Sequence, residues 1–222
     1  MKTKIHKLSL GFCNCYLIKE KGLILVDGGP PNQGKKFLKK LKELSIEPRE
    51  ISLILLTHGH LDHIGSANEL KELTGCRVIM NQHEKNCLEQ ALILLPPGVN
   101  LLGKILVPIM KLFVPFMKFP GASVDIVLED KEFSLESYGI QGKVLYTPGH
   151  SSGSVSLLLD TGDAFVGDLA MNGFPMRVGP GMPIFAENIR ALKESWRLLL
   201  DRGARTIYPA HGKPFSADLL KN

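Results

Sequence analysis

Short apolar runs separated by glycine turns and lysine-rich stretches make up the first part of the chain. Residues 12–18 and 22–26 are apolar and lead to Gly28 and Gly29, which predicts two strands followed by a glycine turn. Residues 33–44 then predict a helix with a solvated lysine face. The apolar positions of this helix recur at helical spacing: Phe37, Leu38, Leu41 and Leu44.

In the rest of the chain, the predicted strands come in groups rather than one after each helix. We expect further strands at residues 51–57, 77–80, 124–128, 143–147, 154–159, 164–167 and 206–208. We expect further helices at about residues 63–73 and 187–200. This order indicates the α+β class, a β-rich sandwich with helices outside, and argues against a doubly wound parallel sheet.

One long block, residues 88–120, departs from this pattern because most of it is apolar. It contains a near-repeat, in which KILVPIM at 104–110 is followed by KLFVPFM at 111–117. Seven residues make about two helical turns, so a helix here would carry three lysines on one face: Lys104, Lys111 and Lys118. Prolines in the same register would kink it at each repeat: Pro108 and Pro115.

Several roles are open for this block. Its longest stretch without charge, residues 90–103, is too short and too rich in proline to cross a bilayer, which needs about 20 apolar residues. The block is a helical hairpin packed on the core, an apolar lid or pocket wall, or a surface for peripheral lipid contact or homodimer formation. We treat it as an insertion in one domain that spans residues 1–222.

Composition and charge are those of an ordinary globular protein. Of the 222 residues, 44% are apolar and 22% charged, and the net charge is +5 from 27 basic and 22 acidic side chains. Scattered lysines of this kind predict no nucleic-acid partner. Residues 1–6 lack the apolar run of a secretory signal, and the four cysteines form no dense framework, so we expect a cytoplasmic protein. Cys13 and Cys15 would be buried, inert thiols.

Candidate metal ligands concentrate where four predicted strands end. Five of the seven histidines lie at these exits, together with two aspartates: His58, His60, Asp62, His63, His150, Asp168 and His211. Satisfied polar residues scattered over loops would not gather at four strand ends. The pattern therefore predicts a polynuclear metal site along one edge of a sheet.

The spacing of these residues suggests how two cations would be shared. His58 and His60 are two apart, so in an extended segment both imidazoles point the same way, and His150 can complete the set. Asp62 and the two remaining histidines can hold a second cation. Asp168 offers two carboxylate oxygens and can bridge the pair.

These motifs resemble those of the metallo-β-lactamase superfamily over nearly the whole chain. The similarity rests on HGHLDH at 58–63, TPGH at 147–150, the Gly167-Asp168 step and PAHG at 209–212, in that order. An early aspartate, Asp27, resembles the one that braces the histidine loop in that family. The resemblance implies a four-layer αββα sandwich with a dinuclear metal site in a groove at one edge.

The chemistry that the resemblance implies is hydrolysis by a hydroxide that bridges two divalent metal ions. The first ion would polarise the substrate carbonyl and the second would stabilise the departing atom. Asp62 and Asp168 are the expected catalytic residues. Zinc is the expected metal, although iron and manganese suit the same ligands.

Differences from branches of the family narrow the expected substrate. Having both His63 and Asp168 argues against the true β-lactamases, and Met171 stands where acyl-homoserine lactonases have a tyrosine. About ten residues follow Gly212, so we do not expect the C-terminal extension with which glyoxalase II holds its glutathione thioester. A small-molecule ester, thioester or lactone is the expected substrate.

Two segments indicate a hydrophobic or acyl-chain substrate. The block at 88–120 and the loop at 172–185, with the residue before it, supply adaptable methionines: Met110, Met117, Met171, Met176 and Met182. Arg177 could meet a carboxylate or phosphate, although solvent exposure is the default expectation. His6 and His83 have polar neighbours and are expected at the surface.

Two other reactions stay open. One iron on the three-histidine site would suit a persulfide-dioxygenase-like oxidoreductase, and the mild basic charge permits a phosphodiesterase. Metal analysis separates ester hydrolysis from the oxidoreductase reaction, since two zincs per chain favour hydrolysis and one iron with oxygen uptake favours the oxygenase. Activity on a bis-aryl phosphate but not on carboxylic esters would favour the phosphodiesterase.

Overall fold

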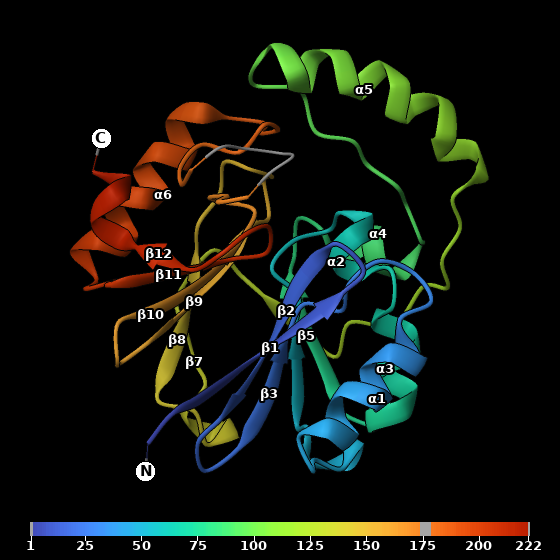
Figure 1. Cartoon of the computed structure of the whole chain (residues 1–222), viewed down its shortest axis with the longest axis vertical. Coiled ribbons are helices and arrows are strands. Elements are labelled where there is room, and N and C mark those ends of the chain that lie inside the picture. The colour runs from blue at the N-terminus through green and yellow to red at the C-terminus, as the bar shows by residue number, and fades with distance from the viewer. Residues whose placement is uncertain (1, 174–178, 222) are drawn as a thin grey trace.

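The structure is a computed structural model that describes residues 2–173 and 179–221. Two six-stranded sheets face each other (Figure 1). The first has the order β1-β2-β3-β4-β5-β6, with bounds Lys4–Leu10, Cys13–Lys19, Leu23–Val26, Leu53–Leu55, Arg77–Asn81 and Ile126–Leu128. Strands β1 to β3 pair antiparallel, whereas β3 to β6 pair parallel.

The second sheet is built from the other half of the chain. Its order is β12-β11-β10-β9-β8-β7. In chain order, β7 to β12 are Phe133–Ser134, Gly142–Tyr146, Val155–Leu159, Asp163–Gly167, Thr206–Pro209 and Phe215–Ser216. Strands β10 and β11 pair parallel and the other neighbours pair antiparallel.

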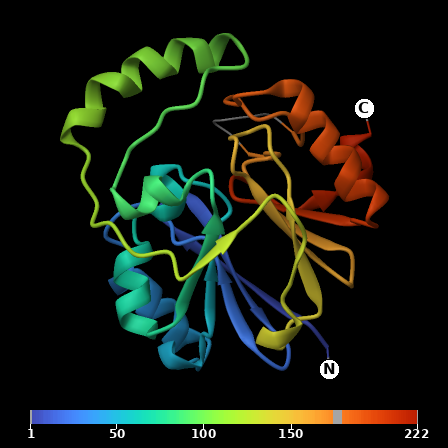
Figure 2. The same ribbon diagram turned by 180° about the vertical axis from the view of Figure 1, so that it is seen from behind.

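Helices cover the outer face of each sheet. Those on the first sheet are α1 Gly34–Glu43, α2 Leu61–Ile64, α3 Ala67–Thr74 and α4 Lys85–Glu89, and α6 Ile189–Asp201 covers the second (Figure 2). Helix α5, Leu101–Phe113, lies apart from both sheets. Short 3-10 turns are η1 Pro48–Glu50, η2 Val114–Phe116, η3 Glu136–Tyr138 and η4 Ala217–Leu220. The predicted four-layer αββα sandwich is confirmed.

Three apolar clusters hold the layers together. The central one joins the two sheets through side chains such as Ile24, Leu55 and Phe165. The outer ones pack Phe37 of α1 on the first sheet and Trp196 of α6 on the second. Burying each such side chain contributes about 1.5–3 kcal/mol. The predicted apolar face of α1 is confirmed at Phe37 and Leu41, which are buried, but Leu38 is exposed and lies outside that face.

The helix predicted over residues 63–73 is wrong as one element, since the structure breaks it into α2 and α3. Gly65 packs so closely against Pro31 that a Cβ atom there would clash. The Ser66 hydroxyl accepts a hydrogen bond from the Gln33 amide at 2.9 Å, and the Ser66 amide donates to the Gly29 carbonyl. These contacts with the loop after β3 separate the two helices, and sequence periodicity carries no sign of them.

The block at 88–120 is not a helical hairpin packed on the core, as one prediction had it. Its one long helix is α5, flanked by extended chain, and within that helix only Gly103 is buried. The helix continues through Pro108 and gives way to η2 at Pro115. Lys118 therefore lies beyond the helix, and only Lys104 and Lys111 share a helical face. None of the helices in the described residues is long and apolar enough to cross a membrane.

Candidate metal centre

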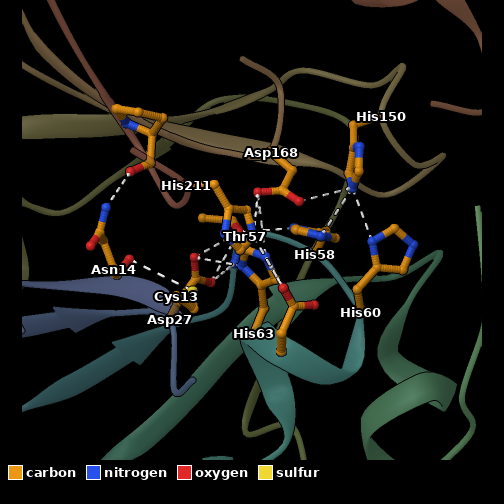
Figure 3. A network of polar contacts seen from close by, with 12 residues as sticks. Cys13, Asn14, Asp27, Thr57, His58, His60, His63, His150, Asp168 and His211 are labelled. Carbon is orange, nitrogen blue, oxygen red and sulfur yellow. Dashed lines mark hydrogen bonds and ion pairs between the residues drawn. The ribbon is translucent and has the colours of Figure 1, made fainter. Parts of the chain in front are cut away.

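The histidine loop leaves the first sheet at the carboxyl end of β4. This strand is fully buried, and His60, five residues beyond it, is the N-cap of α2. On the second sheet, His150, Asp168 and His211 follow β8, β10 and β11. Figure 3 shows the side chains from the two sheets converging. All seven predicted ligands thus meet at one edge of the sandwich.

Three histidines form the first group of ligand atoms. The Nε2 atom of His150 lies 3.2 Å from Nε2 of His58 and 2.9 Å from Nδ1 of His60. All three side chains are buried. Their ligand atoms lie within 4.8 Å of one another, a separation that suits a single cation.

The second group combines two acids and two histidines. Nε2 of His211 lies 3.1 Å from Oδ2 of Asp62 and 3.3 Å from Oδ1 of Asp168. Nε2 of His63 lies 3.5 Å from the same Asp168 oxygen. The four ligand atoms again lie within 4.8 Å of one another.

Asp168 lies between the two groups. Its Oδ1 faces His63 and His211, whereas its Oδ2 lies 3.7 Å from Nε2 of His150 (Figure 3). The carboxylate directs one oxygen toward each group. This is the arrangement expected of a ligand that bridges two cations.

Partners outside the groups orient four of the imidazoles through their Nδ1 atoms. His150 donates to the Phe185 carbonyl at 2.9 Å and His211 to the Phe12 carbonyl at 3.2 Å. Nδ1 of His63 lies 3.0 Å from Asp27. Nδ1 of His58 lies 3.1 Å from the hydroxyl of Thr57, which itself donates to Asp27. Such partners fix the tautomer and leave Nε2 as the ligand atom.

The same hydrogen bonds leave lone pairs directed at one another inside the site. With their Nδ1 hydrogens donated outward, Nε2 of His58 and Nε2 of His150 are both acceptors, yet they lie 3.2 Å apart. Among the described residues, the buried side-chain atoms without a hydrogen-bond partner are Nε2 of His63 and Oδ1 of Asp168. Buried polar atoms are normally paired. The residues therefore fit divalent cations.

Burial favours neutral imidazoles in the first group, whereas in the second group the negative charge of neighbouring groups outweighs burial and raises the pKa of His63 and His211. Burial lowers the pKa of His58 and His150 below the ordinary value, and it lowers the pKa of His60 to about 3 with help from His150. Burial alone would raise the pKa of Asp62, but His63 and His211 bring it down to about 2. Neutral imidazoles and ionised carboxylates are the ligand forms.

Asp27 braces the histidine loop, as the resemblance implied. It is buried, and its Oδ1 accepts from both the backbone amide and the hydroxyl of Thr57 at 2.9 Å. Its other oxygen contacts His63. One carboxylate therefore fixes the loop on both sides of the His58-to-His60 segment.

Glu84 is a buried residue that the sequence did not single out. It accepts hydrogen bonds from the Gly59 amide, between two ligands, and from the Gly153 amide at 2.9 Å, in the loop after His150. It therefore joins the two loops that build the first group. Its one sequence signal is that an acid closely follows the buried strand β5.

The tip of the β1–β2 hairpin also contributes to the site. The Phe12 ring lies 6.1 Å from the His211 ring at an interplanar angle of 18°, although 66% of Phe12 is exposed. Asn14 donates from its side chain to the Gly212 carbonyl at 2.8 Å. The hairpin thus positions the turn that carries His211, and nothing in its sequence indicated this.

A cavity of about 490 Å³ opens above the ligand groups. Five predicted ligands line it: His60, Asp62, His150, Asp168 and His211. Much of its apolar lining comes from the block at 88–120, including Leu94, Leu106, Met110, Phe116 and Met117. Its size and apolar lining are typical of small-molecule sites. The block therefore forms a wall of the cavity, one of the roles left open.

The remaining sequence predictions have mixed outcomes. Met171 lines the cavity, whereas Met176 and Arg177 lie outside the described residues. The His83 side chain is 42% exposed and contacts Asp130 at 2.9 Å, which confirms a surface position. His6 is half-buried on β1.

The two cysteines of the hairpin behave as expected. Cys13 and Cys15 are fully buried in the same apolar cluster. Burial raises the pKa of the Cys15 thiol. The pKa of the Cys13 thiol is raised mainly by its hydrogen bond with Cys15 and, to a smaller extent, by burial. Both are inert thiols at neutral pH.

Comparison with known proteins gives one family match. The model of the metallo-beta-lactamase superfamily matches residues 8–211. The probable metallo-hydrolase YqgX of Bacillus subtilis is 31% identical over 160 residues, which cover 71% of this chain and 65% of that protein. The hydroxyacylglutathione hydrolase GloC of Haemophilus influenzae is 28% identical over 169 residues, covering 72% of this chain and 68% of that protein.

Solved structures share the fold. The BLEG-1 B3 metallo-beta-lactamase superposes with a TM-score of 0.71 at 21% identity, covering 97% of this chain and 95% of that one. The superfamily protein ST1585 of Sulfolobus tokodaii gives 0.68 at 23% identity, covering 100% and 84%. At such identity the likeness concerns the fold alone.

Proposed function

This chain belongs to the metallo-beta-lactamase superfamily, and we propose that within it the chain is a dinuclear metal-dependent hydrolase. Its substrate would be an ester, thioester or lactone with a hydrophobic or acyl portion. The observation that carries the proposal is Asp168, whose two oxygens face two separate groups of ligand atoms. The similarity to GloC, named as a hydroxyacylglutathione hydrolase, supports a thioester among the substrates.

The seven ligands divide the work of holding two divalent cations, for which we propose zinc. The three-histidine group would hold one, and Asp62, His63 and His211 the other, with Asp168 shared. Two such cations supply Lewis acidity and a nucleophile generated from water near neutral pH. Asp27 and Glu84 keep the histidine loop in place by accepting hydrogen bonds from its backbone amides. No serine or cysteine nucleophile is needed.

The apolar wall is the part that selects substrate. Leu106, Met110 and Met117 line the cavity together with the ligands, so a carbonyl at the ligand groups would place an attached chain against them. Methionine side chains adapt to flexible chains at low cost. Each methylene that leaves water contributes about 0.8 kcal/mol, or about fourfold in binding.

A chain-length series tests this proposal. We expect kcat/KM on aryl esters to rise by about threefold to fourfold per methylene until the cavity is filled. Met110→Trp should flatten this rise by filling the cavity, whereas Ile109→Trp, at a 47% exposed position of the same helix, should not. A preference for short polar esters would contradict the proposed substrate.

Metal analysis of the unsupplemented protein tests the proposed metals and the type of reaction. Two zincs per chain with hydrolysis that a chelator abolishes support the proposal. One iron per chain with oxygen uptake on a persulfide, or cleavage of a bis-aryl phosphate alone, would replace it by another reaction.

A further inference from the structure

Helix α5 exposes large apolar side chains on the outside of the molecule. Leu101 is 74% exposed, Leu112 70% and Ile105 53%. Figures 1 and 2 both show the helix as an outermost element, held away from the sandwich by extended chain at each end. Side chains of this size in such a patch usually mark a contact with a partner or a lipid surface.

The helix has two faces with different roles. Its inner face carries Leu106 and Met110, four residues apart, which line the cavity. Its outer face carries Leu101, Ile105 and Leu112, whose spacing of four and seven residues places them in one stripe. These three residues do not line the cavity. The outer stripe is therefore not explained by the proposed function.

The charge around this stripe has one sign. Residues 90–124 contain three lysines and no acidic residue. Lys104 and Lys111 are exposed on the helix two turns apart, so they lie on one flank of the stripe. A helix with an apolar face beside lysines is suited to lie in the interface of a bilayer that carries anionic headgroups.

We propose that the outer stripe of α5 docks on an anionic lipid surface, with the helix axis in the plane of the membrane. The cavity lies directly behind the helix, since Leu106 and Met110 face it. A chain leaving the lipid at the outer face of α5 would have only this helix between it and the cavity. This delivery of substrate rests on the proposed function, whereas the docking does not.

A second copy of the chain is a weaker occupant for the same face. A two-fold contact uses the same patch on both subunits. It would bring a second pair of lysines, Lys104 and Lys111, to the contact, and residues 90–124 of the other copy offer no acid to pair with them. Anionic headgroups neutralise these lysines directly.

Co-sedimentation of the full chain with vesicles tests the docking. We expect binding to phosphatidylcholine vesicles that contain phosphatidylserine, little binding to pure phosphatidylcholine, and weaker binding at higher salt. Replacing both Lys104→Gln and Lys111→Gln should lower the partition coefficient on the order of thirtyfold. The matched double variant Lys36→Gln and Lys39→Gln, on exposed positions of α1, should bind as the wild type.

An apolar variant and an activity assay complete the design. Leu101→Gln, Ile105→Gln and Leu112→Gln together should abolish vesicle binding, while hydrolysis of a soluble short-chain ester stays unchanged because these residues do not line the cavity. Vesicle binding without any ester hydrolysis would sink the proposed function and leave the docking intact.

Three results would overturn the docking: no binding of the wild type to either vesicle, equal loss in the α1 control, or a wild-type dimer that the apolar variant converts to monomer while vesicle binding stays at background. The last result would assign the stripe to a second copy of the chain.

Discussion

Four of the five buried imidazoles of the site, His60 being the exception, have Nδ1 bonded to a partner outside the ligand groups and Nε2 directed into the site. In His63, Nδ1 contacts Asp27 and Nε2 has no partner. Burial lowers the pKa of His211, but Asp168 and Asp62 raise it above the ordinary value, and the pKa of His63 is raised in the same direction. The negative charge that favours a proton on His211 also favours a cation in its place. At this scale, the site is organised for positive charge in its second group and for neutral nitrogen ligands in its first.

Replacing the shared carboxylate should separate the two groups. In Asp168→Asn, one oxygen is lost and a nitrogen that cannot bind a cation takes its place, so we expect one metal per chain and at least about a hundredfold loss of ester hydrolysis. Asp163→Asn, at the opposite end of the same strand β10, is the matched control and should keep both metals. Metal content by elemental analysis decides, and two metals in Asp168→Asn would refute the bridging role.

Glu84 should act through the loops that it joins rather than on the substrate. Its pKa is raised above the ordinary value, because burial outweighs the hydrogen bonds from Ser151 and from the Gly153 and Gly59 amides. Glu84→Gln turns one accepting oxygen into a donor that faces an amide hydrogen. We expect metal affinity to fall by about 10- to 100-fold with the fold retained.

Competition of the protein with a chromophoric chelator measures this affinity. Glu89→Gln, in the ion pair with Lys85 on the same helix, is the control and should bind metal as the wild type. If excess zinc fails to restore hydrolysis in Glu84→Gln, a role in holding the ligand loops is wrong.

At the scale of elements, strand ends could be read from the sequence and contacts between distant loops could not. The seven candidate ligands could be predicted because the segments that carry them follow buried strands, and strands that run in the same direction bring their carboxyl ends to one edge. The break between α2 and α3 could not, because it arises from Gly65 packing against Pro31 in another loop. The roles of Glu84 and of the Phe12 carbonyl could not be predicted for the same reason, since each forms a hydrogen bond with a residue far away in the sequence.

The block at 88–120 shows a second limit of sequence patterns. One role left open for its apolar run was the wall of a pocket, and Leu106 and Met110 do line the cavity. The pattern did not tell core from surface, because a helix that is apolar on most sides suits either. Of the two prolines in the near-repeat, Pro115 lies where α5 ends and η2 begins, whereas the helix continues through Pro108.

One ion pair fastens the return of this block to the sandwich. Lys71 of α3 contacts Asp125 at 2.6 Å and donates to the Ser123 carbonyl at 2.9 Å, just before β6. Burial alone would raise the pKa of Asp125, but Lys71 and the Val78 amide lower it below the ordinary value. Lys71→Met should therefore reduce the free energy of unfolding by about 1 kcal/mol at neutral pH.

This loss should depend on pH in one direction. A carboxyl with a lowered folded pKa contributes its stability above the unfolded value of about 3.9, and the contribution disappears as the pH falls through the folded pKa. The difference between wild type and Lys71→Met should thus shrink in acid to what the Ser123 contact of Lys71 contributes, as urea titrations at several pH values can show. Lys39→Met on α1 is the control, and a difference in stability that is just as large at low pH as at neutral pH would exclude the ion pair as its cause.

For the whole molecule, the site joins the same two halves that the apolar cluster between the sheets and hydrogen bonds such as Asn14 to Gly212 hold together. His58, His60 and His63 come from the first half, and His150 and His211 from the second. A cation held by both halves binds the folded chain and not the unfolded one. By mass action, free metal at a hundred times its Kd adds about 2.7 kcal/mol of stability.

The expected consequence is a thermal shift that tracks the ligands. Saturating zinc should raise the Tm of chelator-stripped protein by about 5–10 °C per site, since about 1 kcal/mol shifts a chain of this size by about 2–4 °C. His63→Ala removes one ligand of the second group and should lose part of the shift, and comparing each variant with and without zinc cancels the cost of leaving Asp27 unpaired. His83→Ala, at the exposed contact with Asp130, should shift as the wild type does. A zinc-induced shift of the same size in His63→Ala and the wild type would mean that the second group holds no cation, and the two-metal hydrolase would have to give way to a one-metal site.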